Sequence, residues 1–370
     1  MVKALYLHIP FCSRRCPYCD FTSFTGSEEM ISDYLTLLPE EARLYADYPH
    51  RIETLYVGGG TPSVLAPESI GALVDELHRV LDLSALKEFT VECNPENYSY
   101  REFRELLSIG VNRVSIGVQS FTPKGLRTLG RSHSAEKAVE AMISAREAGF
   151  ENVSLDLIYG YPDQEPSDLR QELRWIEELR PTHLSAYLLT LHEGTPLHLR
   201  VHRGELSLPS EEELCRLHGI LSDGLRELGY ERYEISNWSL PGYRCRHNLA
   251  YWNLEEFFGL GVSAWGFVEG RRYCNLKDLA GYRRRILEGR RPLKTEIPLS
   301  EEELFEEFLM LRLRLRRGLP HIYRHLIPPH LRGFFEEGGE GIGIREEYLL
   351  LSDEIITEVL LYNSHRNARR

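Results

Sequence analysis

The stretch Cys12-Ser-Arg-Arg-Cys16-Pro-Tyr-Cys19 follows directly on the first apolar run of the chain, Ala4–Ile9. Its spacing is C-x3-C-x2-C, and three such thiolates can ligate three irons of a [4Fe–4S] cluster, which normally takes four cysteines. The fourth iron then keeps an open position, as in catalytic zinc sites. An amine and a carboxylate, such as the methionine end of S-adenosylmethionine (SAM), can chelate that iron. The cluster supplies an electron that cleaves the sulfonium and yields a carbon radical.

A zinc site and a helical stripe of cysteines both fit the triplet less well. A zinc site needs a fourth ligand, and the second C-x2-C pair of a zinc ribbon is missing. A helical stripe is geometrically possible, but Pro17 favours a loop. The chain has seven cysteines, an odd and clustered set that does not indicate a disulfide framework. We therefore expect iron–sulfur chemistry in a reducing compartment, the cytoplasm.

The first 190 residues alternate β-branched runs with amphipathic stretches, which Gly and Pro separate. This alternation predicts an α/β fold with a parallel sheet and right-handed crossovers. The pattern alone does not distinguish a doubly wound sheet from a barrel. The expected strands are Ala4–Ile9, Thr54–Val57, Phe89–Glu92, Arg113–Val118, Val153–Ile158 and His183–Leu189, and the expected helices are Met30–Tyr45, Ile70–Leu81, Tyr100–Leu107, Ala135–Ala148 and Ser167–Leu179.

The placement of polar and special residues favours the barrel. Each of five such residues lies at or just past the C-terminal end of an expected strand, the rim on which parallel barrels build their sites. A single carboxylate at a strand end is usually structural, but residues on five successive ends indicate a common site. These residues are Cys12, Gly59, Glu92, Gln119 and Asp156.

The second half of the chain has a different pattern. We expect a partial (β/α)6 barrel over residues 1–230, an aromatic-rich extension over 231–298 and a small α+β, winged-helix-like domain over 299–370. The expected elements of this half are helices at Glu211–Leu228 and Glu301–Arg317, a turn at Gly338–Gly343, a strand at Tyr348–Leu351 and a final helix from Ser352.

Composition limits the partners. The net charge of −12 argues against nucleic acid, since phosphate binding needs an excess of Lys and Arg. No secretory signal precedes Cys12, and no apolar run of about 18 residues that would span a bilayer occurs. The basic stretch Arg283–Arg291 could contact a membrane surface, although a solvated helix face is the simpler interpretation.

Seven motifs follow one another along the chain. They are Tyr6-Leu-His-Ile-Pro-Phe-Cys12, Cys16-Pro-Tyr-Cys19-Asp-Phe21, Gly58-Gly59-Gly60-Thr61-Pro62, Glu92-Cys-Asn-Pro95, Ser115-Ile-Gly-Val-Gln119-Ser-Phe121, Asp156-Leu-Ile-Tyr-Gly160 and His247-Asn-Leu-Ala-Tyr-Trp252. In this order they resemble the radical SAM superfamily, and more narrowly the branch of oxygen-independent coproporphyrinogen oxidase and the related haem chaperone (HemW) family. The resemblance covers nearly the whole chain and implies a [4Fe–4S] cluster and SAM as cofactors.

The resemblance implies roles for one loop and one carboxylate. Gly59, Gly60 and Thr61 correspond to the loop that meets the methionine amino group, where glycine allows the backbone to approach a ligand closely. Without the resemblance, this loop would be a simple turn before a helix. Glu92 corresponds to the carboxylate that binds the ribose hydroxyls of SAM.

Further positions are implied to hold SAM. Tyr6 and Tyr18 correspond to residues that flank the adenine and the cluster, although either could pack in a core. Gln119, Arg131 and Asp156 correspond to residues that hold a second SAM in the oxidase. For Arg131 and Asp156 an internal ion pair at the barrel rim is the competing interpretation.

Two departures from the oxidase pattern favour the haem chaperone. The oxidase has a further cysteine where this chain has Phe21, and a long N-terminal extension where this chain has eleven residues before Cys12. Oxidative decarboxylation of coproporphyrinogen, or a related methyl transfer, is the alternative function. A pure binding module is a third class, which the acidic charge disfavours.

The chaperone interpretation also implies partners and a haem-binding residue. His247 lies in the motif linked to haem binding, and imidazole is a suitable axial ligand for haem iron. Cys245 is a second possible ligand, and a histidine among aromatics is otherwise a core residue. The expected partners are haem, haem-accepting proteins, an electron donor, and a second copy of the chain in a homodimer.

Overall fold

The computed structural model describes residues 1–367, with side chains described as far as Ser364. Six strands form the centre of its sheet, pair in sequence order and run parallel throughout. All six were predicted, and each extends the predicted range or comes within one residue of it. They are β1 (Val2–Ile9), β2 (His50–Gly59), β3 (Glu88–Cys93), β4 (Arg113–Gln119), β5 (Asn152–Tyr159) and β6 (His183–Leu188).

Several of the helices that connect these strands begin at strong capping signals. Ser99 and Glu102 form a capping box at the start of α3, and the Ser134 side chain caps α5, so that exposed backbone donors at both helix starts are satisfied. The connecting helices are α1 (Glu28–Arg43), α2 (Pro67–His78), α3 (Tyr100–Ser108), α4 (Pro123–Thr128), α5 (Ala135–Ala148) and α6 (Pro166–Leu179).

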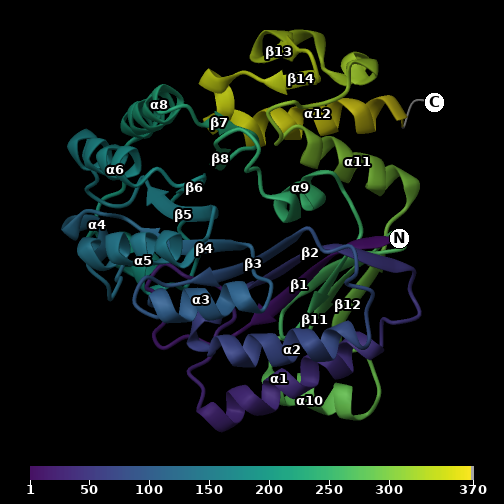
Figure 1. The fold of residues 1–370 in the computed structure, drawn as a ribbon. Helices are drawn as coiled ribbons and strands as arrows, with labels where there is room; N and C mark the ends of the chain where they lie inside the picture. The colour runs from purple at the N-terminus through teal and green to yellow at the C-terminus, as the bar shows by residue number, and fades with distance from the viewer. Residues whose placement is uncertain (368–370) are drawn as a thin grey trace.

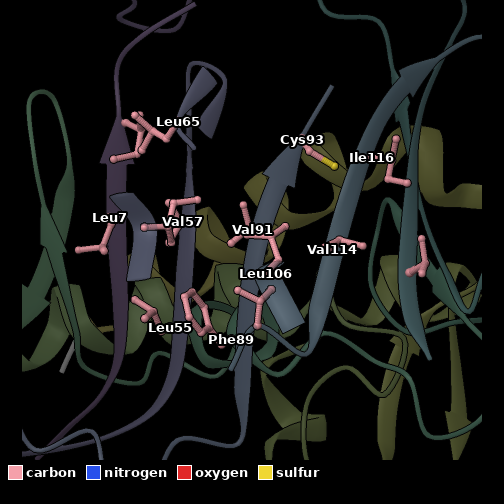
Figure 2. Close-up of a cluster of buried hydrophobic side chains, with 14 of the residues drawn as sticks. Leu7, Leu55, Val57, Leu65, Phe89, Val91, Cys93, Leu106, Val114 and Ile116 are labelled. Atoms are coloured by element: carbon pink, nitrogen blue, oxygen red, sulfur yellow. The ribbon is translucent and has the colours of Figure 1, made fainter. Parts of the chain in front are cut away.

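The two faces of the parallel strands differ in chemistry. One face carries fully buried apolar side chains, such as Leu55, Val91 and Val114, and Figure 2 shows them together with Leu106 of α3, which belongs to the same cluster. Because side chains alternate along a strand, the neighbouring residues point to the opposite face. There they are polar, as at Glu92 and Asp156. The polar face is therefore the one available for a site.

The sheet is a partial barrel, extended on both sides. Within the described residues it does not close, because β1 pairs with β9 rather than with β6, and β12 and β7 form its two edges. The sequence pattern did not predict these additional strands, which are two to six residues long. They are β7 (Glu231–Arg232), β8 (Asn237–Ser239), β9 (Phe257–Leu260), β10 (Trp265–Val268), β11 (Arg271–Asn275) and β12 (Leu293–Pro298).

The added strands place the aromatic-rich segment within the large sheet. β9 runs parallel to β1, with Ala4 opposite Phe257 and Leu7 opposite Leu260, and β10 to β12 follow it as an antiparallel meander. The helices of this half are α7 (Pro196–His202), α8 (Glu211–Glu227), α9 (Arg246–Trp252) and α10 (Leu279–Leu287).

The C-terminal elements form a second hydrophobic cluster, built by Leu309, Ile342, Val359 and their neighbours. They are α11 (Glu301–Arg312), the hairpin β13 (Phe335–Gly338) and β14 (Gly341–Ile344), and α12 (Ser352–Asn367). Figure 1 shows these elements gathered at one end of the molecule, far from α1, α2 and α10. The predicted turn at Gly338–Gly343 lies in the hairpin.

Two predictions for this region were wrong. The expected strand Tyr348–Leu351 lies within a 3-10 helix, Glu346–Leu351, which leads directly into α12. An apolar run of this length suits a buried strand or a buried helical turn equally, and here the adjoining helix decides. Helix α11 ends at Arg312 instead of Arg317, and Leu315 forms an isolated bridge with Glu234, which follows β7. Among the described residues, no helix combines the length and the apolar character that crossing a membrane requires.

Candidate functional site

The cysteine triplet lies on the loop between β1 and α1, at the carboxyl end of the parallel strands. The backbone holds this loop: Cys12 N–H donates to the Phe24 carbonyl at 3.0 Å, and Cys19 N–H to that of Cys16 at 3.2 Å. Each of the three cysteines is partly exposed and lines a cavity of about 450 Å³. The loop that Pro17 predicted therefore brings three thiols to one cavity.

Two donors contact the sulfurs. The Thr61 hydroxyl donates to Cys12 Sγ at 3.4 Å, and the Arg131 guanidinium donates to Cys16 Sγ at 3.3 Å. A hydrogen-bond donor and a cation both favour negative charge on sulfur, the form that binds metal. Burial raises the pKa of Cys19, and the neighbouring Cys16 and Cys12 add to that rise. Cys19 is therefore close enough to the other two thiols to be affected by their charge.

The arrangement fits a cluster better than a single metal ion. In the part of the chain that the structure describes, no three His, Cys, Asp or Glu side chains converge on one point that could hold a metal ion. A [4Fe–4S] cluster needs no such convergence, because each cysteine binds a different iron. The donor set of Cys12, Cys16 and Cys19 on one cavity wall therefore fits a cluster with one iron not bound by the protein.

The glycine loop after β2 passes immediately behind the cysteine loop. Gly60 N–H donates to the Ile9 carbonyl and Thr61 N–H to the Phe11 carbonyl, each at 2.8 Å. A Cβ on Gly60 would lie 2.8 Å from the Phe11 carbonyl oxygen and 3.0 Å from Cys12 Sγ. Gly60 is therefore required for the close approach of the two loops.

Glu92 lies in the cavity at the end of β3. Its carboxylate accepts from the Tyr56 hydroxyl at 2.8 Å and from Gly59 N–H at 3.1 Å. Burial raises the pKa of Glu92 to about 7, and the nearby Asp156 adds to the rise. Asp156 accepts from the Ser115 hydroxyl at 3.0 Å, and burial raises its pKa as well. Two carboxyl groups thus share one buried, polar wall.

Arg131 reaches across the cavity without pairing with Asp156. Its terminal nitrogens donate to Asn94 Oδ1 at 2.7 Å, to the Gly117 carbonyl at 2.9 Å and to Cys16 Sγ. Within the described residues no ion pair joins it to Asp156, so the internal pair considered from the sequence is not formed. Gln119 completes this wall with a left-handed backbone (φ 65°), a strained conformation that is common at functional sites.

Two tyrosines take different positions. Tyr18 lines the cavity between Cys16 and Cys19, and burial raises its pKa. Tyr6 is not among the residues that line this cavity; it lies behind Tyr56, at 6.2 Å between ring centroids, and lines a second pocket.

His247 lies outside the cavity and inside the protein. It is 1% exposed, and its ring stacks on that of Tyr56 at 5.1 Å. Nδ1 is 2.9 Å from the Thr54 hydroxyl and Nε2 is 2.7 Å from the Tyr251 hydroxyl. Burial lowers the pKa of His247 to about 3, so the ring is neutral. Both ring nitrogens are thus already engaged.

Cys245, the other candidate ligand in this segment, is also buried. Its thiol contacts Glu88, which accepts from the backbone N–H groups of Arg246 and His247 at the start of α9. Neither His247 nor Cys245 therefore presents a free donor atom to the cavity.

Comparison with known proteins decides the family. The model of the radical SAM superfamily matches residues 6–176. A protein of Lactococcus lactis named "Heme chaperone HemW" is 37% identical over 317 residues, which cover 86% of this chain and 83% of the relative. The Escherichia coli protein of the same name is 36% identical, with 86% and 84% covered. The chain belongs to the HemW family of radical SAM proteins.

The fold agrees with this assignment. The solved structure of coproporphyrinogen III oxidase (HemN) from Escherichia coli superposes with a TM-score of 0.82 and 23% identity, covering 98% of this chain and 90% of that one. This likeness concerns the fold alone. Membership of the superfamily brings a [4Fe–4S] cluster and SAM as cofactors of this HemW-family chain, and the cavity at the cysteine triplet has the donors for both.

Some residues of the cavity were not predicted as site residues. Asn94 and Ser115 lie within the family motifs, and their bonds to Arg131 and Asp156 explain why these polar residues stand there. Tyr56, the donor to Glu92, had no signal beyond its place on a strand.

Proposed function

We propose that this chain is a haem chaperone, which binds haem and transfers it to haem-requiring proteins. The observation that carries the proposal is the identity of 37% and 36%, each over 86% of the chain, with proteins named haem chaperones. The site is consistent with this role, because Phe21, 58% exposed, stands where the oxidase pattern has a further cysteine.

We propose that the cavity holds one SAM rather than two. Glu92, Gly59, Gly60 and Thr61 border the cysteine triplet and would hold the SAM bound to the cluster. Arg131, the residue implied to hold a second SAM, already directs three of its N–H groups to Cys16 Sγ, Asn94 Oδ1 and the Gly117 carbonyl, while its buried Nε has no partner. We therefore propose that Arg131 acts on the cluster through Cys16, and that Gln119 and Asp156 shape the far wall. Equilibrium dialysis of the reconstituted protein tests the stoichiometry, with one SAM per chain expected and two contradicting it.

Haem-accepting proteins are the partners that the proposal requires. The predicted membrane contact at Arg283–Arg291 has weaker support, because Arg283 pairs with Asp33 at 3.2 Å and Arg291 pairs with Glu296 at 3.0 Å. The charges of these two arginines are thereby largely balanced. An electron donor, a homodimer and the cytoplasmic location remain predictions.

Two assays on the anaerobically reconstituted protein test the function. In the first, haem-loaded protein is mixed with an apo-haem protein, and the absorption of the acceptor is followed. We expect transfer of bound haem to the acceptor. In the second, coproporphyrinogen is supplied with SAM and a reductant, and no decarboxylation is expected. Turnover without haem binding would overturn the proposal in favour of the oxidase.

A further inference from the structure

A second pocket, of about 350 Å³, is lined by Tyr6 and His8 of β1 and lies on the side of that strand where β9 pairs with it. It lies where β1, β9 and β10 meet α9 and α11, and its volume falls in the range of roughly 300–1,000 Å³ typical of small-molecule sites. Its main lining residues are Tyr6, His8, Tyr251, Phe257, Trp265 and Arg272.

Aromatic rings form most of the walls. The Tyr251 and Phe257 rings meet edge to face, with centroids 4.5 Å apart. Trp265, 52% exposed, stands at the rim as one of the most exposed large apolar side chains of the protein. An exposed tryptophan beside buried aromatic walls suits the flat face of a conjugated ligand.

The charged groups of the pocket are balanced. Arg272 forms a bidentate pair with Glu307, with a closest distance of 2.6 Å, and its guanidinium lies over the Phe267 ring at 4.5 Å. Burial lowers the pKa of His8 to about 4, so its imidazole is neutral. Glu255, which also lines the pocket, lies 4.0 Å from the Lys3 ammonium, so the pocket offers apolar surface, neutral polar groups and ion-paired charges.

Each of the two tyrosines that line the pocket is within hydrogen-bond distance of a different histidine. The Tyr6 hydroxyl donates to His8 Nδ1 at 3.1 Å, because His8 Nε2 donates to the Thr22 carbonyl at 3.2 Å and must carry the hydrogen. On the opposite wall the Tyr251 hydroxyl is 2.7 Å from His247 Nε2. Of the two residues in this second pair, only Tyr251 lines the pocket.

We propose that this pocket is the haem-binding site, taking the planar tetrapyrrole against Tyr251, Phe257 and Trp265. His247 then acts as a positioning residue that fixes the Tyr251 ring from behind, and it does not bind the iron. This inference rests on the proposed function and names its site. It also explains why the His247-Asn-Leu-Ala-Tyr-Trp252 motif combines a buried histidine with a tyrosine one helical turn later.

The pocket shares a wall with the SAM cavity. A Cβ on Gly59, which lines the cavity, would lie 2.6 Å from His8 Nδ1. Tyr6 lies next to Tyr56, which donates to Glu92 in the cavity. Haem and SAM would therefore bind on opposite sides of the same few side chains.

The test measures binding of haem and of metal-free protoporphyrin to the reconstituted full chain, by absorption and by quenching of tryptophan fluorescence. Trp265→Arg places a charge at the rim, and we expect it to weaken both ligands at least tenfold. The matched control is Ile322→Arg, which changes a side chain that is 77% exposed in the C-terminal region. The control should bind both ligands as the wild type does, and both variants should retain cluster absorption.

Comparing the binding of haem with that of metal-free protoporphyrin distinguishes a positioning role of His247 from ligation of the iron. A positioning residue affects both, so His247→Ala and Tyr251→Phe should weaken haem and metal-free protoporphyrin by similar factors, and His247→Gln should restore part of the binding. An axial ligand affects haem alone. Loss of haem binding in His247→Ala with unchanged protoporphyrin binding would overturn the positioning role.

Failure of the site and failure of the function are distinguishable. If the wild type binds haem and Trp265→Arg binds it equally well, the pocket is not the site, although the proposed function stands. If the wild type binds neither haem nor protoporphyrin, the proposed function fails as well.

Discussion

Arg131 donates to Cys16 Sγ at 3.3 Å and so links the strand ends of the barrel to the cysteine loop. The same guanidinium donates to Asn94 Oδ1 at 2.7 Å, and the Arg131 residue is partly buried. Groups that hydrogen-bond to the ligands of a cluster influence its stability and its potential. Arg131 is accordingly placed to stabilise a cluster bound by the cysteine triplet.

Replacing Arg131 should therefore reduce cluster retention. Arg131→Ala leaves the Asn94 oxygen and the Cys16 sulfur without their donor, and we expect the iron content after anaerobic reconstitution to fall at least twofold. Arg131→Lys keeps the charge and should lose less. Arg127→Ala, an exposed arginine of α4, is the control and should retain the full iron content. Equal iron content in all variants would contradict this role.

Gly60→Ala should disturb the same loop through steric contact. The added Cβ would lie 2.8 Å from the Phe11 carbonyl oxygen, and overpacking of this kind costs about 1–3 kcal/mol. Urea unfolding of the apo-protein measures the loss. Gly219→Ala is the matched control, since nothing lies within 4 Å of its Cβ in α8 and alanine favours a helix. A control as unstable as Gly60→Ala would refute the steric explanation.

Glu92 predicts a pH dependence of apo-protein stability. Its pKa in the folded state is raised to about 7, so the folded protein holds this proton at pH values where the unfolded chain has released it. The contribution is present at low pH and is lost as pH rises towards 7 and beyond. Glu92→Gln removes it, and the variant should gain on the order of 1–3 kcal/mol relative to wild type between pH 5 and pH 8. Urea unfolding of both proteins at pH 5 and at pH 8 measures this gain. If the difference in unfolding free energy between Glu92→Gln and wild type were the same at both pH values, the raised pKa of Glu92 would be contradicted.

The C-terminal hydrophobic cluster around Leu309 should be essential for the stability of the elements that form it. Leu309 on α11 is fully buried, and truncation of a buried leucine typically costs about 2–5 kcal/mol. We expect Leu309→Ala to lower the unfolding midpoint strongly, and Leu351→Ala, at an exposed position, to change it little. Hydrogen exchange would show whether the loss is confined to residues beyond 299. Equal midpoints for the two variants would contradict the packing.

Much of the fold could be predicted because its signals are local. The six parallel strands follow from apolar runs between Gly and Pro, and the cysteine loop from Pro17. The pairing of β9 with β1 joins residues about 250 positions apart, and a four-residue strand carries no periodicity that would reveal it. The sheet edge and the second pocket were therefore outside what the sequence could predict.

The same distinction between local sequence signals and long-range contacts applies to the candidate site. The residues at strand ends converge on one cavity, as their common position predicted. The partners of Arg131 could not be predicted, because the sequence does not tell which of several oxygens and sulfurs a long side chain reaches. The placement of His247 outside the cavity depends on the direction of α9 and on Glu88, which accepts from the Arg246 and His247 N–H groups.

The central claim is that Cys12, Cys16 and Cys19 hold a cluster whose remaining iron binds SAM. Electron paramagnetic resonance of the reduced, reconstituted protein, recorded with and without SAM, tests it most directly. We predict a [4Fe–4S] signal that shifts when SAM is added, that is lost in each single Cys→Ala variant of the triplet, and that persists in the control Cys215→Ala. A signal indifferent to SAM, or one that survives removal of the triplet, would contradict the account.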